Sequence, residues 1–236
     1  MSGANDGGMR LAFSTLGCPD WSLERVAEAA REYGYDGLEL RLVDGELLAP
    51  HPSQAERERM RAVLQGVPVV AVDTSLRMAA PEPGWEDDLR GYCEVAVELG
   101  CDLLRVFGGT ATPGDDTGIV DHLRTAGAIA GASGVRVVLE THDDFSSARA
   151  VQRVLAQVPE PAVGALWDLH HPYRMGEEPE EVWDLIGART LLVHVKDAVR
   201  DETERTGWKL VLLGEGEVPV QRSLTVLRER GYRGWV

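Results

Sequence analysis

The chain has 236 residues, of which 44% are hydrophobic, and no Ser/Gly/Pro-rich linker divides it, so we expect a single domain over residues 1–236. Its formal net charge of −15 would repel the phosphate backbone of DNA or RNA, which argues against a nucleic-acid partner. No apolar run approaches the ~20 residues of a membrane span, and the polar N-terminus "MSGANDGGMR" lacks a signal-peptide core. These features predict a cytoplasmic protein without a membrane partner. The three cysteines form no CxxC pair and are expected to be small buried residues.

Short apolar runs recur along the chain and are separated by longer amphipathic stretches. Nearly continuous apolar runs are typical of parallel strands that are buried on both faces. They predict strands over residues 10–15, 37–41, 67–74, 102–107, 135–142, 164–171 and 191–197. The intervening stretches carry apolar residues at helical spacing and predict helices over residues 21–34, 85–100, 115–134, 146–158 and 180–187.

This alternation of strands and helices predicts a parallel sheet, either doubly wound or closed into a barrel. No Gly-rich GxGxxG or GxxxxGK loop follows the first strand. The sequence therefore lacks the phosphate-binding motif of doubly wound nucleotide-binding proteins. Polar residues instead collect at the C-terminal ends of many strands. This is typical of a barrel, in which the C-terminal ends of all strands surround one opening, called the mouth below. We therefore predict a (β/α)8 TIM barrel. The last six residues, "GYRGWV" (231–236), echo "YGYDGLEL" (33–40) and would open the eighth strand, so we expect the last strand and helix to be truncated.

Three ionisable residues follow the apolar runs of successive predicted strands. They are Glu140, Asp168 and His194, separated by 28 and 26 residues. One strand–helix unit spans about that length, so the three side chains should converge at one height on neighbouring strands. Two carboxylates and an imidazole suit a divalent cation such as Mn²⁺, Co²⁺, Mg²⁺ or Zn²⁺, and without a cation the carboxylates would repel each other. Taken singly, each residue could instead belong to a structural ion pair.

Six motifs together carry a resemblance to a known family: "GYDGLELR" (34–41), "LETHDDF" (139–145), "WDLHHPYR" (167–174), "HVKD" (194–197), "LGEGEVP" (213–219) and "GYRGW" (231–235). In their order and spacing, the chain resembles the sugar phosphate isomerase/epimerase family of xylose isomerase-like TIM barrels, in the AP endonuclease family 2 superfamily. The resemblance implies that Glu140, Asp168 and His194 hold a divalent metal ion, with Mn²⁺ favoured over Mg²⁺, Co²⁺ and Zn²⁺. It also implies that Glu140 is the catalytic base.

In that family a Glu from the eighth strand is a fourth metal ligand. The resemblance therefore implies a Glu a few residues beyond Val236, and we expect a longer polypeptide that contains it. A barrel that lacks its last strand and helix would leave an unpaired edge beside the first strand.

The resemblance implies substrate-binding roles for other polar residues near the predicted mouth. His171 matches the histidine of the family's D-x-x-H motif, with core packing as the alternative, and Arg200 matches an arginine of the ketose epimerases, with simple solvent exposure as the alternative. Glu39 is expected to hydrogen-bond to the substrate. Lys196 either polarises a carbonyl or pairs with a carboxylate, and His142 either lines the pocket or points outward.

The activity implied by the resemblance is that of a metal-dependent isomerase or epimerase of a sugar, sugar phosphate or polyol. Such an enzyme abstracts a proton next to a carbonyl and passes through an enediolate. A lyase that dehydrates an inosose-like ketone or cleaves a 3-keto-glycoside would use the same base and metal, and the residues do not separate the two. A non-catalytic sugar-binding descendant is a further alternative. The expected partner is a small-molecule carbohydrate, and the resemblance is compatible with a homodimer.

Overall fold

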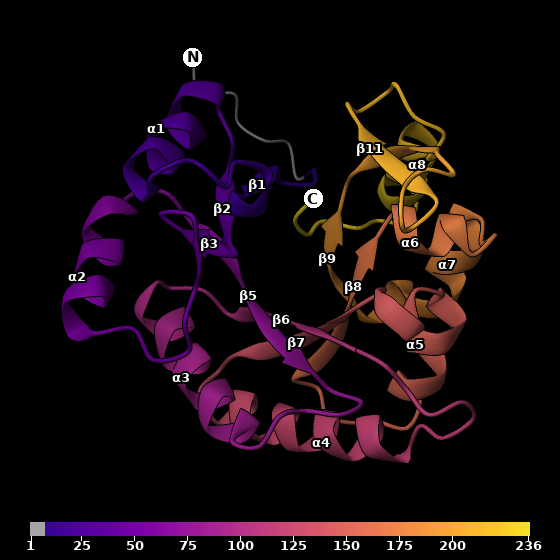
Figure 1. The fold of residues 1–236 in the computed structure, drawn as a ribbon, viewed down its shortest axis with the longest axis horizontal. Helices are drawn as coiled ribbons and strands as arrows, with labels where there is room; N and C mark the ends of the chain where they lie inside the picture. Colours follow the sequence, from indigo (N-terminus) through magenta and orange to yellow (C-terminus); the bar gives the residue numbers. More distant parts are fainter. Residues whose placement is uncertain (1–7) are drawn as a thin grey trace.

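The computed structural model describes residues 8–236, in which one curled parallel sheet is surrounded by helices (Figure 1). The sheet has seven strands in the order β1-β2-β5-β6-β7-β8-β9, and every neighbouring pair is parallel. Their bounds are Ala12–Ser14 for β1, Gly37–Leu40 for β2, Val69–Arg77 for β5, Leu103–Phe107 for β6, Arg136–Glu140 for β7, Val163–Asp168 for β8 and Thr190–His194 for β9. This arrangement is the predicted α/β barrel.

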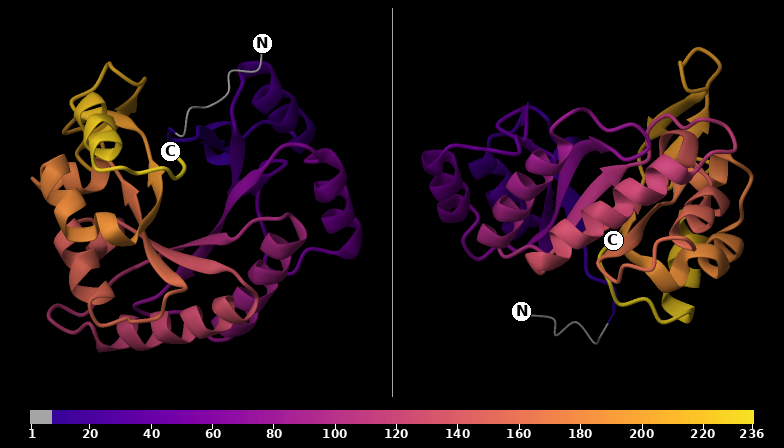
Figure 2. Two further views of the ribbon diagram at one scale, coloured as in Figure 1. Left: turned by 180° about the vertical axis from the view of Figure 1, so that it is seen from behind. Right: turned by 90° about the horizontal axis from the view of Figure 1, so that it is seen from below.

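The helices lie on the outside of the curled sheet, as both views in Figure 2 show. They are α1 (Leu23–Tyr33), α2 (Gln54–Val63), α3 (Trp85–Glu98), α4 (Thr117–Ala132), α5 (Ala148–Leu155), α6 (His170–Arg174), α7 (Pro179–Ile186) and α8 (Val220–Glu229). Within residues 8–236, none of these helices combines the length and apolar character needed to cross a bilayer.

The sequence analysis did not predict α2 and α8, and it extended the sixth strand too far. A capping box begins α2, in which Glu56 N donates to Ser53 Oγ and Ser53 N donates to Glu56 Oε2. This S-x-x-E signal was available, but α2 has few apolar residues to reveal a helical face. Residues 170 and 171 were assigned to a strand, whereas they begin the short helix α6.

Residues 234–236 lie between β9 and β1, where the eighth strand was predicted. Val193 N donates to the Trp235 carbonyl (3.1 Å), and Val236 N donates to the Arg10 carbonyl (2.9 Å). The Arg10 guanidinium also lies 3.8 Å from the centre of the Trp235 ring. Backbone pairing therefore covers part of the edge of β1 that was expected to be unpaired, and Figure 1 shows the C-terminal residue beside β1.

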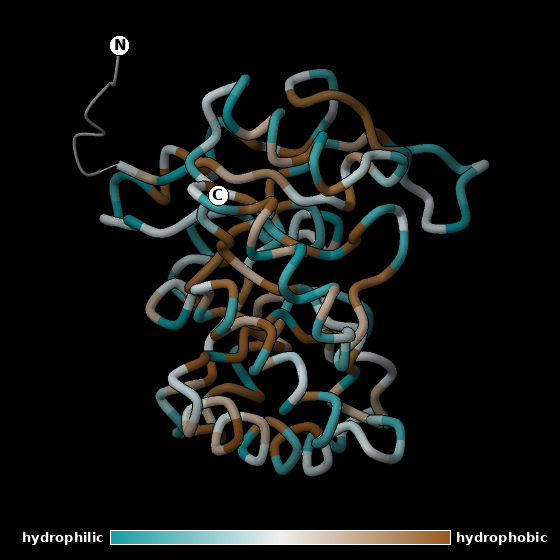
Figure 3. Tube along the Cα trace, turned by 90° about the vertical axis from the view of Figure 1, so that its left-hand side faces the viewer, coloured by the Kyte–Doolittle hydropathy of each residue, from teal (hydrophilic) through white to brown (hydrophobic). Residues whose placement is uncertain are grey.

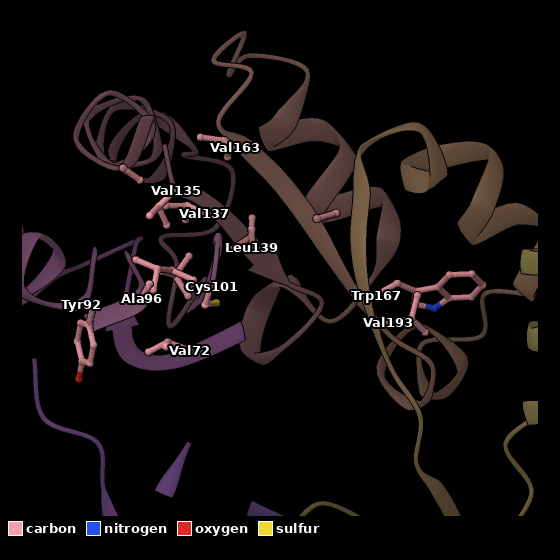
Figure 4. Packing of buried hydrophobic residues seen from close by; sticks show 14 of the residues in the cluster. Val72, Tyr92, Ala96, Cys101, Val135, Val137, Leu139, Val163, Trp167 and Val193 are labelled. Carbon is pink, nitrogen blue, oxygen red and sulfur yellow. The ribbon is translucent and has the colours of Figure 1, made fainter. Parts of the chain in front are cut away.

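Apolar side chains fill two regions, one between the sheet and the helices and one inside the barrel. The interior of the fold is largely hydrophobic and its projecting loops are largely hydrophilic (Figure 3). Figure 4 shows part of the outer cluster, where strand residues such as Val72, Val137 and Leu139 lie near Ala96 of α3. The inner cluster contains Val70, Ala71, Leu103, Val138, Leu166 and Leu192.

Side-chain alternation places a polar layer directly above this inner apolar cluster. In a strand, residues two apart face the same side. Asp73, Arg105, Glu140, Asp168 and His194 each stand two positions after an inner apolar residue of the same strand. The apolar cluster thus supports a ring of ionisable groups at the carboxyl ends of the strands.

A two-stranded hairpin follows β9 and is anchored by Asp197. The hairpin consists of β10 (Asp197–Arg200) and β11 (Trp208–Val211), and a shorter one is formed by β3 (Leu42–Val43) and β4 (Glu46–Leu47). The buried Asp197 carboxylate accepts hydrogen bonds from the backbone N–H groups of Ala198, Gly214, Gly216 and Val218 at 2.9–3.1 Å. The aspartate of the "HVKD" motif therefore holds the "LGEGEVP" loop against the end of β9.

We expect Asp197→Ala to lower the free energy of unfolding by about 3 kcal/mol, because it leaves several backbone donors without their charged acceptor. Glu202→Ala removes an exposed carboxylate from the loop between β10 and β11, and it should change the free energy of unfolding by less than about 0.5 kcal/mol. Urea denaturation of both variants measures the difference. Equal stability of the two variants would show that the Asp197 hydrogen bonds do not hold the loop.

Candidate active site

Six ionisable side chains gather at the carboxyl ends of six neighbouring strands. They are Glu39 of β2, Asp73 of β5, Arg105 of β6, Glu140 of β7, Asp168 of β8 and His194 of β9. All but His194, which is partly buried, are almost fully shielded from solvent. Charges in such a position must compensate one another, because desolvation disfavours every uncompensated charge.

His194 lies between two carboxylates. Its Nε2 donates to Glu39 Oε2 at 2.6 Å, and its Nδ1 lies 3.4 Å from Glu140 Oε1. Burial alone would lower the pKa of His194, but the charges of Glu39 and Glu140 and their hydrogen bonds raise it well above the ordinary value. Without a metal ion the imidazole is therefore a cation that neutralises part of the carboxylate charge.

Arg105 bridges the other side of the polar layer. Its Nη2 donates to Asp73 Oδ2 at 2.9 Å, and its Nε lies 3.4 Å from Glu140 Oε2. Burial would raise the pKa of Glu140, but His194 and then Arg105 outweigh it and lower the pKa to about 2. Burial raises the pKa of Asp73 to about 7, helped by the Glu39 charge and opposed by Arg105. Glu140 is thus held as a carboxylate, whereas Asp73 binds a proton more readily than Glu140 does.

Asp168 is completely buried and interacts with Lys196. Lys196 Nζ lies 2.6 Å from Asp168 Oδ2 and 3.4 Å from His171 Nε2. Burial lowers the pKa of His171 to about 2, and the charge of Lys196 adds to the shift. His171 is therefore a neutral imidazole that accepts a hydrogen bond from the Lys196 ammonium.

Three aromatic rings, including that of His171, lie in contact across the mouth. The rings of His171 and His142 are 4.5 Å apart between centres, and those of His142 and Phe107 are 4.7 Å apart. His142 Nδ1 lies 2.8 Å from Asp143 Oδ1. The His142 ring thus lies between Phe107 and His171.

Arg200 lies apart from the polar layer. It is exposed on the hairpin, and its guanidinium packs over Trp208 at 5.1 Å from the ring centre. Among residues 8–236, no ion pair joins it to Glu140 or Asp168. Trp208 contacts His170, the neighbour of His171, and these rings link Arg200 to the mouth.

The donor set of Glu140, Asp168 and His194 fits a divalent cation. One donor atom from each residue lies within 4.8 Å of the others. Asp168 Oδ2 is buried and has no partner that meets the geometry of a hydrogen bond. The nearby Lys196 ammonium compensates its charge. Glu39 binds one ring nitrogen of His194, and the other ring nitrogen therefore points toward Glu140. Metal-binding histidines are commonly oriented in this way, by a carboxylate that binds the nitrogen not used for the metal.

A second set, Glu39, Asp73 and His194, meets the same distance criterion. Both sets contain a carboxylate that is paired with Arg105. The second set is a poorer cation site because Glu39 Oε2 and His194 Nε2 are already joined by a hydrogen bond of 2.6 Å, whereas Glu140 Oε1 lies 3.4 Å from His194 Nδ1. Between the two sets, the geometry favours Glu140, Asp168 and His194.

The structure thus gathers Glu39, Glu140, Asp168, His171, His194 and Lys196 at one mouth and leaves Arg200 on the hairpin. Glu39, for which a hydrogen bond to the substrate is expected, lies against His194. The sequence analysis noted polar residues at many strand ends but assigned no role to Asp73 or Arg105. Both stand two residues after an inner apolar position, and this spacing was the available signal.

Comparisons with known proteins agree with this architecture. A 3-dehydroshikimate dehydratase of Pseudomonas putida is 28% identical over 145 residues, which cover 58% of this chain but 23% of that protein. A xylose isomerase domain protein from Planctomyces limnophilus superposes with a TM-score of 0.77 at 20% identity, over 98% of this chain and 91% of the other. A D-allulose 3-epimerase from Methylomonas sp. gives a TM-score of 0.75 at 19% identity, over 96% and 82% of the two chains.

Proteins of similar fold also include a zinc-bound structure and a magnesium complex. At these identities the likeness establishes the fold. The model of the xylose isomerase-like TIM barrel family matches residues 27–236, and the chain belongs to this family.

Proposed function

We propose that this chain is a divalent-metal-dependent isomerase or epimerase of a sugar or polyol. The observation that carries the proposal is the buried set Glu140, Asp168 and His194, whose donor atoms lie within 4.8 Å of one another at the mouth of the barrel. The fold is shared with an epimerase, and zinc- and magnesium-containing relatives support a metal ion without identifying it. Mn²⁺ is our preferred metal, with Mg²⁺, Co²⁺ and Zn²⁺ as alternatives.

In this proposal Glu140, Asp168 and His194 hold the cation, and Glu39 orients His194. The bound cation would polarise a substrate carbonyl and make the adjacent C–H more acidic. Glu140, kept ionised by His194 and Arg105, accepts the proton from that carbon. Return of the proton to the former carbonyl carbon, while the hydroxyl proton moves to the former carbonyl oxygen, gives an isomer. Protonation of the original carbon from the opposite face, by water rather than by Glu140, gives an epimer.

The polar groups next to the metal ligands would position the substrate. Lys196 can donate to a substrate oxygen while it contacts Asp168, and neutral His171 can exchange hydrogen bonds with a hydroxyl group. The His142 ring covers one side of His171 and helps to exclude water.

Dehydration is a second candidate, favoured by the contact between Lys196 and His171. In this reaction Glu140 removes the C–H proton, the C–O bond on the next carbon breaks, and Lys196 protonates the departing hydroxyl to release water. The sequence similarity to a dehydratase supports this candidate over part of the chain.

Metal content tests the ligand set. The wild-type protein, stripped with EDTA and refilled with Mn²⁺, should bind one ion and melt at a higher temperature. We expect Asp168→Ala to weaken Mn²⁺ binding more than Glu39→Gln, for which the usual loss for an orienting carboxylate is roughly 10–100-fold. Calorimetric titration measures both affinities, with Asp184→Asn on the surface of α7 as the unchanged control. Wild-type affinity in a folded Asp168→Ala protein would rule out this metal site.

Hydrogen exchange tests the proton-transfer step. In D₂O, the Mn²⁺-loaded protein should incorporate deuterium next to the carbonyl of an accepted ketose or inosose, as measured by NMR. Glu140→Gln should slow this exchange by roughly 10²–10⁴-fold, the usual contribution of a positioned base. Exchange at the wild-type rate in the folded variant would exclude Glu140 as the base.

Lys196 distinguishes the two candidate reactions. If the protein dehydrates its substrate, Lys196→Ala should slow water loss by at least about 100-fold while deuterium exchange continues, because C–H cleavage precedes departure of the hydroxyl. Chromatography of the products and NMR measure the two rates, with exposed Lys209→Ala as control. Isomerised or epimerised product without any dehydrated compound from the wild-type protein would exclude the second candidate.

A further inference from the structure

A second layer of side chains lies at the mouth, above the ionisable layer. Arg41, Phe107, His142 and Lys196 each follow a member of the ionisable layer by two residues. Contacts between these side chains show that they share the mouth: the Arg41 guanidinium lies 5.9 Å from the Phe107 ring centre, and Phe107 packs on His142. This layer is the part of the site that a substrate would meet first.

The layer has a cation at each end, and the two cations differ in their partners. Lys196 is paired with Asp168 at 2.6 Å. The Arg41 side chain makes one hydrogen bond, from Nη1 to the Asp73 carbonyl (3.2 Å), and no carboxylate of residues 8–236 forms an ion pair with it. Arg41 is half-buried, so its remaining donors have lost part of their water without gaining an anionic partner.

The neighbouring cation makes this arrangement more unfavourable. Arg105 lies 3.9 Å from the same Phe107 ring. The burial of Arg41 and then the charge of Arg105 lower the Arg41 pKa and outweigh the opposing charge of Asp73. Arg105 is compensated by Asp73 and Glu140. Arg41 is the cation in this group to which the described chain supplies no counter-ion.

The backbone holds Arg41 in this position. The Thr15 hydroxyl, which is buried, accepts hydrogen bonds from the backbone N–H groups of Arg41 (2.9 Å) and Leu42 (2.8 Å). The Arg41 carbonyl accepts a hydrogen bond from Leu48 N at 3.1 Å. These bonds fix the backbone from which the Arg41 side chain extends, and the Asp73 carbonyl holds one of its guanidinium nitrogens.

We propose that Arg41 binds a carboxylate group of the substrate, so that the substrate class is a hydroxylated keto acid. A planar carboxylate matches the paired donors of a guanidinium and would supply the missing counter-ion. The rings of Phe107, His142 and His171 form a chain of contacts from Arg41 to Asp168, which the carbon skeleton of a bound substrate could follow. This inference rests on the proposed function, because it places the reacting carbons of the substrate beside Glu140 and the carboxylate of the substrate beside Arg41.

The test compares ligands that differ in charge. Quinate, its uncharged methyl ester and glucose 6-phosphate are titrated into the Mn²⁺-treated wild-type protein and into Arg41→Ala, Arg41→Lys and Arg61→Ala. Arg61 is an exposed arginine on α2, outside the site. We expect the wild-type protein to bind quinate at least tenfold more tightly than the ester. Arg41→Ala should lose roughly 10–100-fold in quinate affinity, Arg41→Lys should retain part of it, and Arg61→Ala should match the wild-type protein.

Three results would overturn the inference: equal wild-type affinity for quinate and its ester, unchanged quinate affinity in folded Arg41→Ala, or tighter binding of glucose 6-phosphate than of quinate. The comparison of quinate with its ester needs only the wild-type protein, so it tests the inference even if Arg41→Ala does not fold. The binding assay is separate from deuterium exchange. A protein that exchanges deuterium but ignores the charge of quinate contradicts only the inference about Arg41, whereas one that prefers quinate but never exchanges contradicts only the proposed reaction.

Discussion

Six ionisable groups share one desolvated layer of this barrel, and each can remain there only because a neighbour compensates its charge. The layer exists because parallel strands end at the same edge and alternate residues face the same side. Arg105 is central to it, since its guanidinium separates the carboxylates of Asp73 and Glu140 that would otherwise repel each other. Removing any one charge changes the protonation of the others, so the reactivity of Glu140 is a property of the whole layer.

The barrel and its metal-binding candidates could be predicted because both leave periodic traces in the sequence. Buried parallel strands read as short apolar runs, and one strand–helix unit separates Glu140 from Asp168 and Asp168 from His194. These patterns determine which strand end carries each residue. They do not determine which side chain contacts which, because that depends on the register and curl of the whole sheet.

Glu39 and Arg200 show where this limit lies. Glu39 is separated from His194 by 155 residues, and only closure of the sheet brings them within 2.6 Å. Arg200 follows His194 by six residues, but an antiparallel hairpin anchored by Asp197 carries it away from the polar layer. Closeness in sequence therefore does not bring Arg200 to the polar layer, and distance in sequence concealed the contact between Glu39 and His194.

The imidazole of His194 links the charge balance of the layer to its chemistry. In the metal-free protein, His194 is a cation between Glu39 and Glu140, and it compensates their negative charge with a proton. A histidine that binds a metal must be neutral at the ligating nitrogen, so metal binding releases a proton from the layer. The same position therefore carries positive charge in both states. The contact with Glu39 that compensates the charge of His194 is also the one that would orient its other nitrogen toward a bound cation.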